Sequence, residues 1–139
     1  MTDTQAMPET IAAWHRLVDS GEPSWLASLI ADDCVFLSPA VHTPQEGKEV
    51  TMHYLTSALV VLGPTLTYQR EWYAENSAVL QFEAELDGSD GKKVSVDGID
   101  MITWGEDGRI TEFAVMVRPV KALHTLMELM AAELFRDRS

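Results

Sequence analysis

One acidic residue stands within a strand-like segment whose neighbours on the same face are apolar. Asp100 alternates with Val96 and Ile102, so burial of this face would remove the carboxyl group from water. Desolvation raises the pKa of a carboxyl group, and a protonated Asp donates a hydrogen bond to an oxyanion that develops on a substrate. We therefore predict that Asp100 is catalytic. A structural role, bonded to backbone amides or paired with Arg70 or Arg118, is the alternative that the sequence leaves open.

A second candidate lies in a loop that two prolines restrict. His42 sits between Pro39 and Pro44, and a neutral imidazole is a suitable general acid or base near pH 7. If Asp100 and His42 face one cavity, they form an acid–base pair, and replacing either should abolish turnover without unfolding the protein. The alternative is a loop histidine bonded to backbone or solvent.

Other reactive residue types predict no further chemistry. The lone cysteine, Cys34, is expected to be a small core residue. His15 is expected to point outward, His124 to lie at the surface or an interface, and pocket access for His53 is left open. No two histidines have the spacing of a helical metal site, and no glycine-rich phosphate loop is present. We expect neither a metal nor another cofactor.

Composition narrows the class of protein. The chain has 139 residues, with 10 Lys and Arg against 22 Asp and Glu, and a formal net charge of −12. Such a charge argues against binding to nucleic acid or to an anionic membrane surface. No segment is apolar for long enough to span a membrane, and no signal peptide is recognisable. We expect a single soluble, cytoplasmic domain over residues 1–139, with residues 1–8 flexible.

The hydrophobic pattern predicts the elements that would position these residues. Helical spacing appears between Pro8 and Gly21, from Pro23 to about Asp33, and from Gly47 to Leu62, with a last helix over 119–136. Short strands are predicted at 34–37, 66–75, 78–87, 92–104 and 109–118, and Leu66, Tyr68 and Trp72 are placed on one face. The last four strands, joined by short turns, must be antiparallel. The order predicts an α+β fold, a curved antiparallel sheet with helices packed on its concave side around an apolar pocket.

Three motifs in this order resemble one family. They are WHRLVDSG at 14–21 with ADDCVF at 31–36, then GKE at 47–49, and GIDMITW at 98–104 followed by DGRI at 107–110. Over about residues 9–118 the chain is similar to the nuclear-transport-factor-2-like superfamily, in its SnoaL-like and ketosteroid-isomerase-like branch. The resemblance implies a cone-shaped half-barrel, an apolar pocket and a homodimer.

The resemblance also bears on individual residues. Asp100 falls where the isomerases carry a neutral Asp, whereas Trp14 replaces their phenol and Ser38 replaces their carboxylate base. Steroid isomerisation by that mechanism is therefore not expected. The Arg-x-Asp arrangement of the family's epoxide hydrolases is absent from the Asp100 strand.

Two functions remain open from the sequence. The first is a cofactor-independent isomerase, cyclase or dehydratase that uses Asp100 and His42 on a small apolar carbonyl compound. The second is a non-catalytic module that binds a hydrophobic ligand or a protein partner. In both, the final helix covers the pocket mouth or joins a dimer interface. The residues expected to line the pocket are Trp14, Ser38, Leu55, Leu80, Phe82, Phe113, Val115 and Val117.

Overall fold

Six strands form one sheet in the order β2–β1–β6–β5–β4–β3. The computed structural model describes residues 6–135. Most of the predicted flexible segment, residues 1–5, therefore lies outside the described residues. The strands are β1 (Ile30–Leu37), β2 (Gln45–Glu46), β3 (Thr67–Tyr73), β4 (Ser77–Asp87), β5 (Lys93–Trp104) and β6 (Ile110–Arg118). Strands β3 to β6 form the predicted antiparallel meander.

The sheet is mixed rather than wholly antiparallel. Strand β1 runs parallel to β6, with Phe36 opposite Phe113, so the expectation of an antiparallel sheet was wrong for this one pair. A short turn forces its two strands to run antiparallel, but β1 and β6 are separated in the chain by α3 and four strands. Their relative direction is therefore not fixed by a turn.

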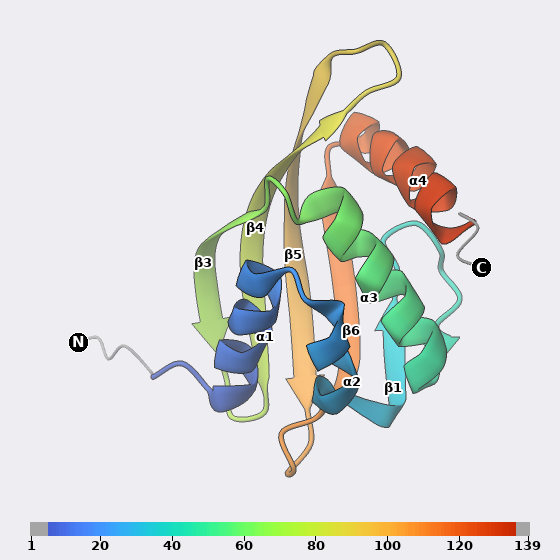
Figure 1. Cartoon of the computed structure of the whole chain (residues 1–139). Helices are drawn as coiled ribbons and strands as arrows, with labels where there is room; N and C mark the ends of the chain where they lie inside the picture. Colours follow the sequence, from blue (N-terminus) through green and yellow to red (C-terminus); the bar gives the residue numbers. More distant parts are fainter. Residues whose placement is uncertain (1–5, 136–139) are drawn as a thin grey trace.

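The helices gather over one face of this sheet, as Figure 1 shows. They are α1 (Glu9–Ser20), α2 (Leu26–Leu29), α3 (Lys48–Leu62) and α4 (Val120–Leu134), with a 3-10 turn at Pro23–Trp25. Helix α1 ends at Gly21, whose φ of 66° is the left-handed conformation that closes many helices. Helices on one face of a curved sheet make this the expected α+β fold.

The second helix is shorter than its apolar spacing predicts. It ends at Leu29, and Ile30 already pairs with Ile110 of β6. The predicted helix extends to about Asp33, and the predicted strand begins at Cys34. Both Ile30 and Cys34 are fully buried, because β1 starts early and packs against the core at both positions.

A bulge in β3 separates two aromatic residues that were predicted to share a face. Tyr68 lies opposite Phe82, but Arg70 lies opposite the next residue, Gln81, so Gln69 is an extra residue in the ladder. Successive side chains of a strand point to opposite faces of the sheet, and an extra residue exchanges the two faces for the residues that follow it. Tyr68 consequently packs against the core, whereas Trp72 is 50% exposed.

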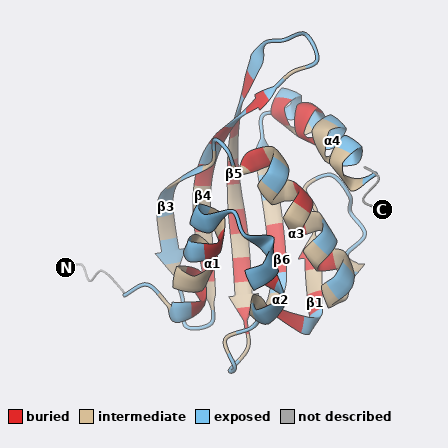
Figure 2. Ribbon diagram, viewed as in Figure 1, coloured by how far each residue is buried: buried red, intermediate tan, exposed pale blue. Residues whose placement is uncertain are grey.

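Buried side chains concentrate on the central strands and on the helix faces turned toward them (Figure 2). Trp14, Leu80 and Phe113 belong to one core cluster, and Phe82 belongs to a second beside α4. Gly98 permits this packing, because a Cβ atom there would lie 2.3 Å from the Phe82 ring. The close approach holds β4 against the strand that carries Asp100.

Candidate active site

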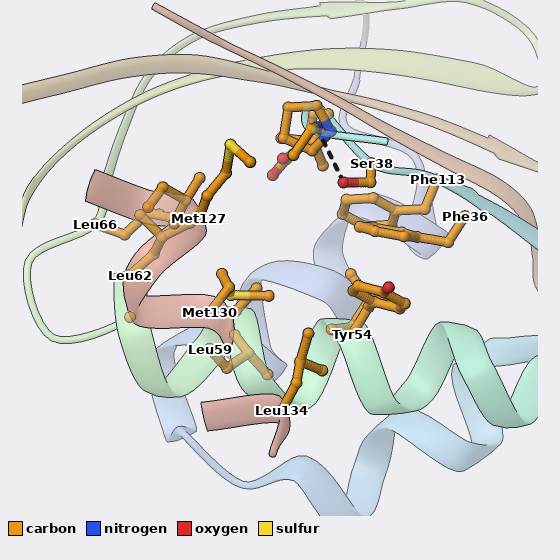
Figure 3. Close-up of a pocket in the computed structure, with 18 of the residues that line it drawn as sticks. Phe36, Ser38, Tyr54, Leu59, Leu62, Leu66, Phe113, Met127, Met130 and Leu134 are labelled. Atoms are coloured by element: carbon orange, nitrogen blue, oxygen red, sulfur yellow. Dashed lines mark hydrogen bonds between the residues drawn. The ribbon is translucent and has the colours of Figure 1, made fainter. Parts of the chain in front are cut away.

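A cavity of about 270 Å³ lies between the covered face of the sheet and helices α3 and α4. Figure 3 shows Leu62, Met127 and Met130 on one side of it and Phe36 and Phe113 on the other. Aromatic rings stiffen this wall: Tyr54 stacks on Phe36 at 5.2 Å between ring centroids. Such a mainly apolar, preformed space is typical of sites for small hydrophobic molecules.

Most of the predicted lining residues border this cavity. Trp14, Ser38, Leu55, Phe82, Phe113 and Val115 do so, together with Asp100. Leu80 and Val117 are not among the lining residues. Leu80 is fully buried in the core cluster, and Val117 packs against the second cluster.

Asp100 is the one carboxylate among the lining residues, and only 5% of its surface is exposed. Its Oδ2 atom accepts a hydrogen bond of 2.7 Å from the Tyr68 hydroxyl, which in turn accepts one of 2.8 Å from Trp14 Nε1. No described arginine pairs with it: Arg70 bonds to Gln81, and Arg118 lies 3.8 Å from Asp97. The arginine pairing considered as an alternative is therefore not formed.

Burial dominates the electrostatics of this carboxyl group. It raises the pKa of Asp100 from 3.8 to about 7, while the Tyr68 hydrogen bond acts in the opposite direction because it stabilises the charged form. The pKa of Tyr68 is raised well above its usual range, first by burial and then by the neighbouring Asp100 carboxylate. Asp100 can thus exchange a proton near neutral pH, whereas Tyr68 stays protonated and acts as a hydrogen-bond donor.

Tyr68 is the site residue that the sequence analysis missed. The resemblance implies that Trp14 replaces a lost phenol, but the structure places a phenol from β3 between Trp14 and Asp100. Alternation along β3 grouped Tyr68 with Trp72, and the bulge at Gln69 breaks that alternation. The available signal was a tyrosine on a strand predicted to lie in the same meander as Asp100, but that strand also carries Tyr73.

His42 does not join Asp100. Its side chain is exposed and does not border the cavity, although its neighbour Val41 does. The Ser38 hydroxyl accepts a hydrogen bond of 3.1 Å from the backbone N–H of Ala40, and the loop borders the cavity only as far as Val41. The structure therefore does not form the predicted His42–Asp100 pair.

The other histidines also lie off the cavity. His53 and His124 are exposed. His15 was expected to point outward, but its Nε2 atom lies 2.6 Å from Glu71 Oε2, and its ring meets the edge of Tyr68 at 5.0 Å between centroids. Glu71 also accepts a hydrogen bond of 2.6 Å from Tyr73. This cluster supports the side of Tyr68 that faces away from the cavity.

Cys34 is a core residue, as predicted. It is fully buried, and burial raises its pKa to about 11, so the thiol is protonated at neutral pH. Within residues 6–135, no three His, Cys, Asp or Glu side chains converge as a metal site would require. No helix in this range is both long and apolar enough to cross a membrane.

The cavity has a polar end and an apolar mouth. Asp100 and Tyr68 lie on the sheet, whereas α4 contributes Met127 and Leu134, and Phe135 follows at 87% exposure. Helix α4 thus forms part of the cavity wall. Because Phe135 both lines the cavity and is exposed, the cavity reaches the surface beside the end of this helix.

The chain is similar to known proteins in sequence and in fold. Residues 11–113 match the SnoaL-like domain family. The fold is similar to the crystal structure of a steroid delta-isomerase from Pseudomonas aeruginosa, which is 36% identical over 91% of this chain and 89% of that chain, with a TM-score of 0.81. An uncharacterised protein with a cystatin-like fold from Silicibacter pomeroyi DSS-3 is 28% identical over 96% and 90% of the two chains, with a TM-score of 0.84.

A more distant structure shares the fold alone. It is a putative SnoaL-like polyketide cyclase from Jannaschia sp. CCS1, 12% identical over 88% of this chain and 96% of that chain, with a TM-score of 0.70. No curated protein matches the sequence.

Proposed function

The chain belongs to the SnoaL-like domain family, and on that premise we propose that it is a cofactor-independent proton-transfer enzyme, of the isomerase type, for a neutral hydrophobic carbonyl compound. Relatives with this fold include a steroid delta-isomerase and a putative polyketide cyclase. Shared fold does not assign a reaction, so the proposal rests on the contents of the cavity.

The observation that carries the proposal is the environment of Asp100. The carboxyl group borders an apolar cavity, its single hydrogen-bond partner among the described residues is Tyr68, and its pKa is about 7. A catalytic acid works best when its pKa lies near the operating pH. A carboxylate kept only for structure would have further polar partners in place of a cavity.

Asp100 acts in its protonated form. It donates a proton or a hydrogen bond to the carbonyl oxygen of the ligand, which weakens the neighbouring C–H bond and favours the enol. Tyr68 then hydrogen-bonds to the carboxylate that forms, and Trp14 polarises the Tyr68 hydroxyl. Since Asp100 is the one carboxylate among the described residues that line the cavity, a water molecule accepts the carbon-bound proton. Water later returns a proton to the carbon that completes the isomerisation.

The cavity also limits the substrate. A charged substrate would lose its hydration against the apolar walls of α3 and α4. For an anion, no Lys or Arg among the described lining residues would compensate for that loss. A neutral molecule with one oxygen function at the end of an apolar body fits both the polar end and the mouth. A β,γ-unsaturated ketone has this form, and the isomerase relative makes steroid ketones the first compounds to test.

Ligand binding without turnover is the second candidate. It is favoured by Ser38, which borders the cavity where the related isomerases carry their base, and by the exposed position of His42. In that case Asp100 and Tyr68 anchor the polar end of the ligand, and no proton is moved.

Turnover of β,γ-unsaturated ketones tests the proposal, since conjugation of the product changes its ultraviolet absorbance. We expect wild-type activity to fall as pH rises through about 7, and Asp100→Asn to reduce kcat by about 10²- to 10⁴-fold. His42→Ala and the exposed control Asp87→Asn should retain activity. Full activity of Asp100→Asn would contradict the proposal, and binding of the ketones without any turnover would favour the second candidate.

A further inference from the structure

Two side chains that line the cavity keep unused hydrogen-bonding capacity. Five of the described lining residues have a nitrogen or oxygen atom in the side chain, and Trp14, Tyr68 and Asp100 are joined in one hydrogen-bond chain. Within it the Trp14 and Tyr68 donors are already occupied. The remaining two residues are Ser38 and Tyr54. Their hydroxyl groups are the neutral donors with which this part of the structure can hold a second polar group of a ligand.

Ser38 offers one donor. Its Oγ atom accepts the backbone N–H of Ala40 at 3.1 Å, which leaves the O–H hydrogen without an acceptor among the described residues. Ser38 is the second residue after Phe36, and both border the cavity, because alternate residues of an extended segment face the same side. A free donor here favours a ligand atom that accepts, such as the oxygen of a carbonyl or hydroxyl group.

Tyr54 offers a second donor, from helix α3. Its ring stacks on Phe36, with 5.2 Å between the centroids and 19° between the ring planes. Its hydroxyl group has no hydrogen-bond partner within residues 6–135. Figure 3 shows Ser38 and Tyr54 on the same side of the cavity as Phe36. The stacking holds the tyrosine ring beside the segment that carries Ser38, so both hydroxyl groups belong to one region of the wall.

The strand register fixes how far this region lies from Asp100. Asp100 is directly opposite Val115 on β6. Leu37 of β1 is opposite Ala114 of β6, and these two strands are parallel. Ser38 therefore comes level with Val115, and Asp100, Val115 and Ser38 form one row across three neighbouring strands. Since adjacent strands are about 4.8 Å apart, the backbones at Asp100 and Ser38 are about 10 Å apart.

We propose that the ligand of this cavity carries a second neutral oxygen function, held by Ser38 and Tyr54, in addition to the oxygen held by Asp100. Each hydrogen bond takes up about 3 Å, so the two ligand oxygens lie about 5–10 Å apart. The ligand class is an apolar ketone with a further carbonyl or hydroxyl group at that separation. This inference rests on the proposed function in taking Asp100 as the partner of the carbonyl oxygen, but it applies to binding with or without turnover.

The second oxygen provides specificity. A ketone with one oxygen engages Asp100 and leaves the Ser38 and Tyr54 hydroxyl groups unpaired against an apolar molecule, which costs affinity. An anionic group in the same place would lose its hydration, and no described lining residue is a Lys or Arg that could compensate. A neutral acceptor is therefore the group that fits this region.

Isothermal titration calorimetry with two saturated ketones of one carbon skeleton tests the inference. The first, 4-cyclohexylcyclohexanone, has a single oxygen, whereas 4,4′-bicyclohexanone adds a second carbonyl at the far end of the same two rings. We expect the dione to bind the wild-type protein about 10-fold more tightly. The double variant Ser38→Ala/Tyr54→Phe should bring the two dissociation constants to within about threefold of each other, because both donors are removed.

Controls separate this effect from misfolding and from catalysis. Ser28→Ala removes a hydroxyl group at an exposed position on α2, away from the cavity, and should keep the preference for the dione. Circular dichroism should show that each variant is folded. Both ketones lack a carbon–carbon double bond, so they report binding alone, and turnover of β,γ-unsaturated ketones tests the proposed function separately. Equal wild-type affinities for the two ketones, or a full preference that persists in the double variant, would overturn the inference.

Discussion

Two carboxylates on the covered face of the sheet have opposite surroundings. Glu71 and Asp100 both lie opposite Leu80, one from β3 and the other from β5, so the three residues form one row across the strands. Glu71 is contacted on one oxygen by Tyr73 and on the other by His15, each at 2.6 Å. Asp100 has one partner, Tyr68, and borders the cavity.

The difference between them shows what distinguishes a structural carboxylate from a reactive one. Both groups are largely removed from solvent, so burial alone does not separate them. Glu71 has each oxygen in contact with a neighbouring side chain, and it does not border the cavity. Asp100 keeps capacity for another hydrogen bond at the edge of an apolar space, where a proton is retained up to about pH 7. We assign the chemistry to Asp100 for this reason.

The largest effect on stability should come from removing the titratable group at Asp100. Its pKa is about 7 in the folded chain against 3.8 for the unfolded one, so the folded state retains a proton that the unfolded state has released. Stability contributed by this group therefore falls as pH rises from about 4 to about 7. At about 1.4 kcal/mol for each pH unit, the loss reaches about 4 kcal/mol.

Asp100→Asn should remove this loss, because an amide does not titrate. Relative to wild type, the free energy of unfolding of the variant should increase between pH 4 and pH 8 by up to about 4 kcal/mol. Urea denaturation at several pH values measures it. Parallel pH profiles for the two proteins would show that Asp100 titrates normally in the folded state and would remove the contrast with Glu71.

Replacing Glu71 should have a smaller effect, on the free energy of unfolding and not on the pH dependence of activity. Glu71→Gln weakens the Tyr73 hydrogen bond to a charged acceptor and the close contact with His15, and should lower the free energy of unfolding by about 1–3 kcal/mol. The pH at which activity falls should stay unchanged, because Glu71 does not border the cavity. The matched control Glu83→Gln, at an exposed position on β4, should change neither quantity.

The comparison would fail if Glu71→Gln left stability intact but shifted the pH profile of activity. Glu71 would then act on the reacting group through His15 and Tyr68, and could not be treated as a structural carboxylate.

Much of the fold could be predicted from the sequence because its signals are local. Alternation along β4 and the turns on either side of β5 define the meander, and Gly21 marks the end of α1. The position of Asp100 followed in the same way, since its strand neighbours Val96 and Ile102 are buried. These features depend on residues that are close together in the chain, so the types and spacing of those residues are enough to predict them.

What could not be predicted depends on contacts between distant segments. The bulge at Gln69 places Glu71, rather than Trp72, on the same face of β3 as Tyr68, and no residue in β3 marks its place. His42 lies outside the cavity although its neighbour Val41 borders it, and His15 lies against Glu71, which belongs to another element. The parallel pairing of β1 with β6 likewise joins strands far apart in the chain.

The most direct test of the central claim is the titration of the Asp100 carboxyl carbon, followed by NMR with Asp100→Asn for assignment. We predict a pKa of about 7 for Asp100 in the wild-type protein. Tyr68→Phe should raise it further, because the Tyr68 hydrogen bond that stabilises the carboxylate is lost. A wild-type value near 3.8, the ordinary pKa of an aspartate, would contradict the assignment of Asp100 as the proton-donating residue.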